Sequence, residues 1–340
     1  MTYVGHTLLA LGMAAALCAS GPALSQPAPV APPPPTAAFQ SAFDDWVQKY
    51  KPQTAIAMVQ IAGRPVFSRG FNANPDAPTL IGSMSKAVTG ACIATLIGEG
   101  KLSFTTPMKD AMPGYFRNFG PPADTRLMDV TVEQLLAHRS GLPGNSDGDP
   151  IHGIFRKRAE AGLGGDASPG PLLQEHFRRK LARDPGSAFS YGNTNYIAIA
   201  QIIEEKSGRP YEDFCRAAVF DKLGIRSARL HSDWRLFSGA GGWTITPADY
   251  MTFLKIFDPA HPFLPQSAKD WIDSAKTKWK SEGTSWYSLG VNTHAVYGRW
   301  FVMHGGLLNS QGRDTDCGRP PPSSRATRSA PPMVHHSFTP

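Results

Sequence analysis

The sequence is poor in cysteine and lacks the common metal-binding motifs. Its 340 residues contain four cysteines and no C-x-x-C pair, which excludes a disulfide framework. The histidines are dispersed and H-E-x-x-H is absent, so we expect no metal and no organic cofactor. Cys92 and Cys215 stand in apolar, helical surroundings, where buried free thiols are favoured over one disulfide.

Concentrated charge and long apolar segments are lacking as well. The net charge of +7 is modest, and no basic stripe indicates nucleic-acid binding. The apolar stretch at 8–19 is too short to cross a bilayer comfortably and precedes small residues, which is typical of a secretory signal peptide. We therefore expect a signal over residues 1–25, export to the periplasm or the exterior, and no stable membrane span after cleavage.

The remaining chain divides into three parts by composition. Residues 26–38 form a Pro/Ala-rich linker of polyproline II character. Residues 39–317 carry the periodic apolar patterns of one folded domain. Residues 318–340 are rich in Pro, Arg and Ser and predict a disordered tail, and the abrupt change in composition suggests a shifted reading frame or a truncation.

The order of the predicted elements indicates an α+β domain. TAIAMVQIAG with PVFSRGF, and later LGVNTHAVY with RWFVMHGG, predict a hairpin near each end of the domain. Residues 83–99 and 193–207 predict buried helices, because they are apolar on every side. We expect one mainly antiparallel sheet built from the chain ends and flanked by helices, with a helical subdomain at about residues 100–240.

Ser83 and Lys86 are the first candidates for chemistry. They stand three residues apart in IGSMSKAVTG, so on a helix they share a face. Burial lowers the pKa of a lysine, and a neutral lysine can take the proton of a serine hydroxyl. By itself S-x-x-K is a common accident, but an unused lysine inside a buried helix is costly.

Two later segments strengthen this interpretation. Tyr191-Gly192-Asn193 directly precedes the second buried helix, where Tyr191 can relay a proton and Asn193 can bind Lys86. His304-Gly305-Gly306 lies on a predicted strand, where glycines often mark the close approach of a ligand.

The order S-x-x-K, Y-x-N, H-x-G resembles the penicillin-recognising serine hydrolases. This family includes class C-type β-lactamases, D-Ala-D-Ala peptidases, D-aminopeptidases and related esterases. Phrases such as VTVEQLLAHRSGLPG and GAGGWTITPADYMTF extend the resemblance over roughly residues 39–312. The substrate it implies is a small molecule or peptide: a D-amino-acid peptide, a β-lactam or an ester.

The resemblance also implies a role for each candidate residue. Ser83 is the acylated nucleophile, Lys86 its base or hydrogen-bond partner, and Tyr191 shares the proton transfers. Asn193 orients Lys86 and the substrate, while His304 and the glycines Gly305 and Gly306 form the strand that binds the substrate, with His304 on its carboxylate. The N–H groups of Ser83 and Leu307 form the oxyanion hole.

Several alternatives remain open from the sequence. Lys86 and Tyr191 compete for the role of general base, and a carboxylesterase is the alternative activity. We expect the family's C-terminal strands and helix to be missing, which would leave the H-x-G strand at a sheet edge. An inactive, truncated family member is therefore a further alternative. Gly144-Asn145-Ser146-Asp147-Gly148 also matches G-x-S-x-G, but we disfavour a nucleophile elbow there because the segment predicts a loop.

Overall fold

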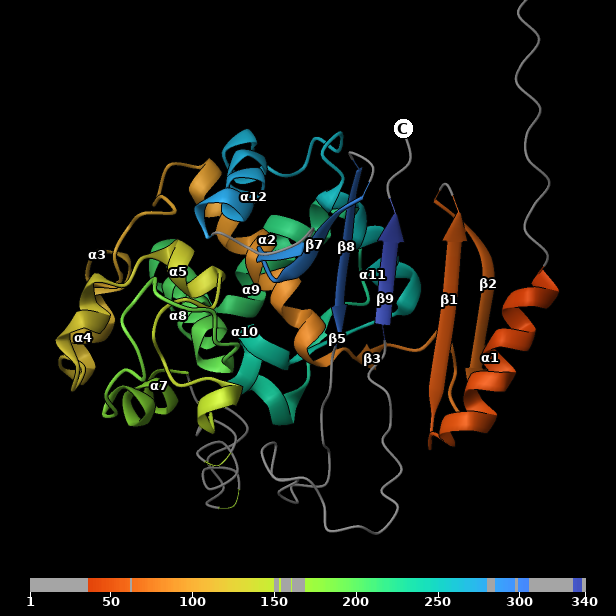
Figure 1. The fold of residues 1–340 in the computed structure, drawn as a ribbon, viewed down its shortest axis with the longest axis horizontal. Coiled ribbons are helices and arrows are strands. Elements are labelled where there is room, and N and C mark those ends of the chain that lie inside the picture. The colour runs from red at the N-terminus through yellow and green to blue at the C-terminus, as the bar shows by residue number, and fades with distance from the viewer. Residues whose placement is uncertain are drawn as a thin grey trace, which may run out of the picture. The chain divides into compact units, whose positions relative to one another are not determined.

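Helices predominate in the described chain, and the strands form three antiparallel sheets (Figure 1). The computed structural model describes residues 36–61, 63–149, 153, 160, 169–279, 285–296, 299–305 and 333–337. The predicted signal peptide, most of the linker, Gly306 and Leu307 lie outside these ranges. No helix within them is both long and apolar enough to cross a membrane.

The strands pair in the order β1-β2, β3-β5-β4 and β6-β7-β8-β9. Their bounds are β1 Ala55–Ile61, β2 Arg64–Phe71, β3 Thr79–Leu80, β4 Arg229–Leu230, β5 Trp243–Ile245, β6 Ser285–Ser288, β7 Val291–Val296, β8 Arg299–Gly305 and β9 Met333–Ser337.

The helices fill the middle of the domain, as the sequence predicts. The α-helices are α1 Thr36–Tyr50, α2 Ser85–Gly98, α3 Met108–Ala111, α4 Pro113–Phe119, α5 Val132–Leu136, α7 Gly170–Phe177, α8 Asn193–Ser207, α9 Tyr211–Cys215, α10 Ser238–Gly241, α11 Pro247–Leu254 and α12 Gln266–Lys278. Short 3₁₀ turns are η1 Gly82–Met84, η2 Thr125–Asp129, η3 Asn145–Asp147, η5 Asp221–Leu223, η6 Ser232–Phe237 and η7 Lys255–Phe257, and η4 Arg216–Phe220 is a π-helical turn.

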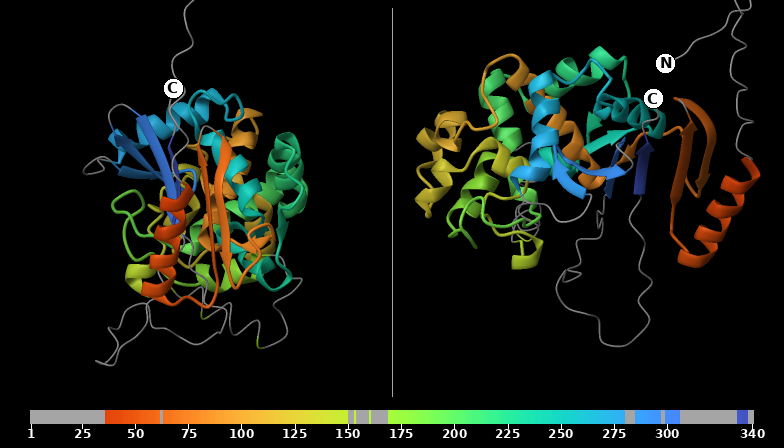
Figure 2. Two further views of the ribbon diagram at one scale, coloured as in Figure 1. Left: turned by 90° about the vertical axis from the view of Figure 1, so that its right-hand side faces the viewer. Right: turned by 45° about the horizontal axis from the view of Figure 1, so that its top comes forward.

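Helix α1 covers one face of the β1–β2 hairpin (Figure 2). Phe39 and Phe43 stand one turn apart on the helix, and both rings pack on Phe67 of β2, with centroids 6.1 and 6.2 Å away. The helix begins at Thr36, so the last three residues of the predicted linker are helical.

The sheet differs from the prediction in two respects. We expected one sheet from both chain ends, but within the described ranges no ladder joins β1–β2 to β6–β9. We also expected β8 at a sheet edge, whereas it pairs with β7 on one side and β9 on the other. Strand β9 lies in the segment predicted to be disordered. Pro331 and Pro332 precede this strand and therefore remove no hydrogen bond from its ladder.

The centre of the domain is a three-helix contact among α2, α8 and α10. Helix α2 is buried along almost its whole length, as its unbroken apolar sequence predicts. Glycine permits the close backbone approaches around it. A Cβ on Gly90 would collide with the Leu289 carbonyl, and one on Gly290 with the Lys86 carbonyl. The β6–β7 turn is thus seated directly against the middle of α2.

Cys92 of α2 and Cys215 of α9 form a disulfide, so the prediction of free thiols is wrong. Their Cα atoms are 5.5 Å apart, although the residues are 123 positions apart in the chain. Apolar neighbours indicate burial correctly, but they carry no information about which distant helix lies alongside.

We predict that Cys92→Ala/Cys215→Ala lowers the free energy of unfolding by about 2–4 kcal/mol, because the cross-link restricts the unfolded chain. Urea unfolding of wild type and the double variant, without reductant, measures the difference. Peptide mapping after alkylation provides the control: recovery of Cys92 and Cys215 as alkylated thiols from unreduced protein would contradict the assignment.

Candidate active site

Ser83 lies in the turn that leads into α2. Gly82 has a φ of 55°, a left-handed conformation that glycine adopts without strain, and it turns the chain from β3 into η1. Ser83 follows at this corner and is partly exposed, whereas Lys86, one turn later, is completely buried. Of the two residues, only Ser83 is therefore reached by solvent.

Lys86 donates hydrogen bonds to three oxygens from three parts of the chain. Its Nζ lies 3.2 Å from the Ser83 Oγ, 2.8 Å from the Asn193 Oδ1 and 2.8 Å from the Ala240 carbonyl oxygen. An ammonium group has three donors, so this arrangement uses all of them. None of these acceptors is a carboxylate.

Burial lowers the pKa of Lys86 to about 7, and the negative charge of Asp149 partly opposes this. Near neutral pH the amine is therefore neutral in a large fraction of molecules. A neutral amine within hydrogen-bond reach of a hydroxyl can accept its proton and make the oxygen nucleophilic.

The start of α8 supplies Tyr191 and Asn193. Gly192 is the extended residue before the helix, and Asn193 is its first residue, with its side chain turned to Lys86. The Asn193 N–H donates to the Asp149 carboxylate at 3.1 Å, so a carboxylate caps this end of the helix. The structure thus brings the predicted Asn193–Lys86 pair together.

Tyr191 lies beside the lysine. Its ring centroid is 4.9 Å from the Lys86 Nζ, and its hydroxyl is buried without a hydrogen bond of ordinary geometry in the described part of the protein. Burial raises the pKa of Tyr191, which the nearby Ser83 hydroxyl opposes and Asp149 reinforces. At a pH at which the Lys86 amine loses its proton, the Tyr191 phenol therefore still keeps its own.

His304 of β8 also lies near Tyr191. The two ring centroids are 6.4 Å apart, and the His304 Nε2 lies 3.0 Å from the hydroxyl of Tyr287 in β6. His304 is almost fully buried and part of the aromatic wall of the site. The three predicted segments therefore converge around Tyr191, whose ring lies near both Lys86 and His304.

Asp149, Tyr287, His138 and the Ala240 carbonyl belong to this site and were missed from the sequence. Asp149 stands in a polar loop and Tyr287 on a short strand, without a motif around either. The carbonyl of Ala240 carries no side-chain signal, although GAGG hints at close packing. His138 lies in LLAHRSGLPG, a segment that resembles the family but contains no residue of its three catalytic motifs.

The structure describes only some of the remaining candidate positions. Gly305 ends β8, while Gly306 and Leu307 lie outside the described residues, so the oxyanion hole that includes Leu307 stays a prediction. Ser146 is exposed within η3, without the preceding strand that a nucleophile elbow needs. Gly144 instead permits close contact, since its Cβ would lie 2.5 Å from the Tyr191 carbonyl oxygen.

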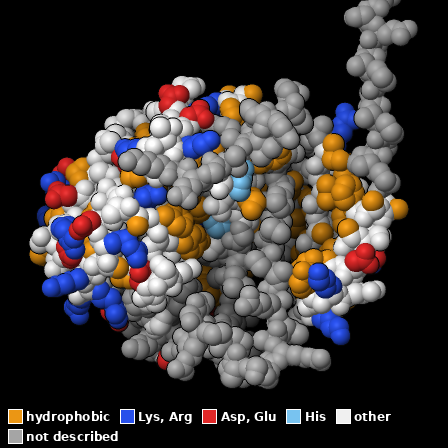
Figure 3. All heavy atoms as spheres, viewed as in Figure 1, with side chains coloured by type: hydrophobic (Ala, Val, Ile, Leu, Met, Phe, Trp, Pro, Cys, Tyr) orange, Lys and Arg blue, Asp and Glu red, His pale blue; other side chains and the backbone are white. Residues whose placement is uncertain are grey.

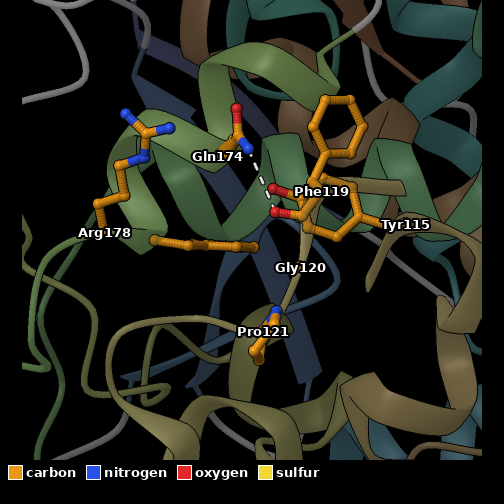
Figure 4. Close-up of a pocket in the computed structure, with 7 residues that line it drawn as sticks. Tyr115, Phe119, Gly120, Pro121, Gln174 and Arg178 are labelled. Atoms are coloured by element: carbon orange, nitrogen blue, oxygen red, sulfur yellow. Dashed lines mark hydrogen bonds between the residues drawn. The ribbon is translucent and has the colours of Figure 1, made fainter. Parts of the chain in front are cut away.

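A separate pocket of about 120 Å³ lies between α4 and α7 (Figure 4). It contains none of the predicted site residues, and Gln174, which lines it, donates to the Phe119 carbonyl at 3.2 Å. On the face seen in Figure 3, Lys and Arg side chains gather over α4 and α7 with acidic side chains among them. Within the described ranges no three His, Cys, Asp or Glu side chains converge as metal ligands.

Comparison with known proteins identifies the family. The Beta-lactamase family model matches residues 39–336, which is most of the chain. The chain belongs to the Beta-lactamase family. The match continues past residue 312, where the recognised phrases end, and includes most of β9.

Relatives in sequence carry penicillin-binding-protein names. The penicillin-binding protein PbpX of Bacillus subtilis (strain 168) is 26% identical over 207 residues, which are 56% of this chain and 46% of that protein. Penicillin-binding protein 4* of the same strain is 27% identical over 162 residues, 45% of this chain and 30% of that protein. The chain thus spans less than half the length of these relatives.

Solved structures show the same fold. A D-stereospecific amidohydrolase from Streptomyces sp. superposes with a TM-score of 0.66 at 22% identity, covering 81% of this chain and 88% of that one. The octameric penicillin-binding protein homologue from Pyrococcus abyssi gives 0.64 at 20% identity, with 81% and 68% covered. The expected β-lactamase-like fold is therefore confirmed.

The position of Lys86 predicts a specific pH dependence of stability. Its folded pKa of about 7 lies below the ordinary 10.5, so between these values the unfolded chain binds more protons and stability rises with pH. Relative to Lys86→Met, the wild-type free energy of unfolding should rise by up to about 1.4 kcal/mol per pH unit from pH 7.5 to 9.5. Urea unfolding across this range measures the slope.

Lys222→Met provides the matched control, since it removes one positive charge from an exposed position. Parallel curves for wild type and Lys86→Met would show that Lys86 keeps its ordinary pKa in the folded protein.

Proposed function

We propose that this chain is an exported serine hydrolase that cleaves amide or ester bonds through an acyl-enzyme on Ser83. The observation that carries the proposal is the Lys86 amine, fully buried and 3.2 Å from the Ser83 Oγ. Membership of the Beta-lactamase family supports the same chemistry. The apolar leader at 8–19 supports export, and so does the disulfide, because disulfides persist in oxidising compartments.

The site suggests an order of proton transfers. Lys86 takes the Ser83 proton as the Oγ forms a bond to the substrate carbonyl carbon, and the N–H groups of Ser83 and Leu307 receive the negative oxygen. The proton passes through Tyr191 to the leaving amine or alcohol as its bond to the carbonyl carbon breaks. A water then attacks the ester, and its proton returns to Ser83 as the acid departs.

The pKa directions favour Lys86 over Tyr191 as the base. Burial lowers the pKa of the amine to about 7 and raises that of the phenol, so near neutrality only the amine is readily deprotonated. Tyr191 then acts as the proton carrier between Lys86 and the leaving group.

D-amino-acid peptides or amides are the substrates we favour, with β-lactams and esters as alternatives. The family resemblance assigns His304 to a substrate carboxylate, and a protonated histidine would bind such a group more firmly than a neutral one. The amidohydrolase from Streptomyces sp. is described as D-stereospecific, which agrees with this preference.

Ser83 should be the only residue that reacts with an active-site probe. We predict stoichiometric labelling of wild type by a fluorescent fluorophosphonate and complete loss of labelling in Ser83→Ala. Gel fluorescence and peptide mass spectrometry measure both. Ser146→Ala is the matched control, because it removes the serine of the competing G-x-S-x-G segment, and it should label as wild type does.

Labelling that persists in Ser83→Ala, or folded wild type that takes no label, would contradict the proposal. The second result would fit an inactive member of the family.

The substrate class can be read from a panel of matched compounds. We predict that hydrolysis of a D-alanine anilide exceeds that of its L-isomer by at least about tenfold, because a chiral pocket rejects the misplaced side chain. Nitrocefin and a p-nitrophenyl ester complete the panel, with Ser83→Ala as the blank. Equal rates on both isomers together with a fast ester reaction would favour the carboxylesterase.

A further inference from the structure

His138 makes several contacts with the segment that carries Tyr191, and the proposed proton transfers give these contacts no role. Its backbone carbonyl accepts the Ser190 N–H at 2.8 Å, and its ring Nδ1 accepts the Gly192 N–H at 3.3 Å. Between these bonds the imidazole ring packs on the Tyr191 ring, with centroids 4.4 Å apart. One residue therefore holds three consecutive residues around the phenol.

We infer that His138 is a positioning residue for Tyr191, acting as a neutral imidazole whose Nδ1 accepts and whose Nε2 carries the proton. The inference rests on the proposed function of Tyr191 in acyl transfer. His138 itself does not exchange protons with the substrate in this scheme.

The tautomer follows from the donors around the ring. A backbone N–H can only donate, so the Nδ1 that receives the Gly192 N–H must present a lone pair. The Asn195 Nδ2 lies 3.2 Å from the same atom and donates to the Gly192 carbonyl as well. Protonation at Nδ1 would set its N–H against the Gly192 N–H and the Asn195 NH₂ group, so the hydrogen bond from Gly192 would be lost.

A hydrogen-bonded chain fixes the orientation of that amide. The Asn195 Oδ1 accepts from the Ser140 Oγ at 2.5 Å, and the Ser140 Oγ accepts the Leu142 N–H at 3.2 Å. A flipped amide would place the Asn195 Oδ1 against the Gly192 carbonyl oxygen, which can only accept, so the NH₂ group stays directed at Gly192 and His138. These hydrogen bonds link the segment HRSG at 138–141 to the segment YGNTN at 191–195.

The surroundings keep His138 neutral. Burial lowers its pKa well below the usual value, and the charges of Lys86 and His304 lower it further. The aromatic rings of Tyr196 and Tyr287 pack against it at 5.1 and 4.7 Å. A charged imidazole here would also discourage protonation of Lys86 during catalysis.

The backbone explains why few residues suit this position. His138 has a φ of 54°, in the left-handed region that histidine and asparagine tolerate better than most residues. Asparagine also offers a carbonyl oxygen near the place of Nδ1, whereas phenylalanine keeps a ring and offers no acceptor. His138→Asn keeps an acceptor at a tolerated φ but loses the ring, and His138→Phe keeps the ring but loses the acceptor and strains the backbone. The stability of His138→Phe, measured by urea unfolding, shows the size of that strain.

The kinetic test compares His138→Phe with His138→Asn in the full chain, using single-turnover acylation by a p-nitrophenyl ester. We expect His138→Phe to slow acylation by at least about tenfold with little change in the half-saturating ester concentration, since misplacement acts on the chemical step. His138→Asn should recover to within about threefold of wild type. Equal rates for His138→Phe and wild type, or equally slow rates for both variants, would overturn the inference.

A spectroscopic test decides the inference without activity. Histidine-selective ¹⁵N NMR should show His138 with an unprotonated Nδ1 and a protonated Nε2 throughout pH 6–9, and Asn195→Ala should perturb the Nδ1 signal. A proton on Nδ1, or titration within this range, would overturn the inference. Wild type that does not acylate would instead refute the proposed function, and this NMR result would still stand on its own. The NMR measurement uses wild type and Asn195→Ala, so it also tests the inference if His138→Phe fails to fold.

Discussion

The burial of one lysine amine is the constraint on which the rest of this structure depends. An unsatisfied ammonium in the interior would cost several kcal/mol, so the fold must surround it with acceptors or let it lose its proton. Both occur here: Ser83, Asn193 and Ala240 supply three oxygens, and burial lowers the pKa of Lys86 to about 7. Lys86 thus requires the start of α2, the start of α8 and α10 to meet at one point.

Small residues make this meeting possible. A Cβ on Gly239 would collide with the Tyr196 carbonyl, so α10 reaches α8 only because glycine stands there. Gly90 and Gly290 similarly allow the β6–β7 turn to pack closely on α2. Thr89, about one turn after Lys86 in α2, donates a hydrogen bond to the Gly239 carbonyl at 2.7 Å. The family phrase GAGG therefore has a packing explanation that is independent of any substrate contact.

The sequence was informative where chemistry or periodicity is local, and silent where partners are distant. The buried helices α2 and α8 and both terminal hairpins are confirmed, because their apolar periods are strong. Ser83, Lys86, Tyr191, Asn193 and His304 converge as their motifs predict. The Cys92–Cys215 bond, the pairing of β9 with β8 and the role of Asp149 depend on contacts across many residues, which no local pattern encodes.

The central claim is that the folded protein holds Lys86 largely neutral beside Ser83 at physiological pH. Direct titration of the Lys86 side chain by ¹³C NMR of ε-labelled lysine, with Lys86→Met identifying the resonance, tests it most directly. The account predicts a midpoint near 7, against the ordinary value of 10.5. A midpoint near 10.5 would mean that the amine is solvated or charge-paired, and Lys86 could not then be the base for Ser83.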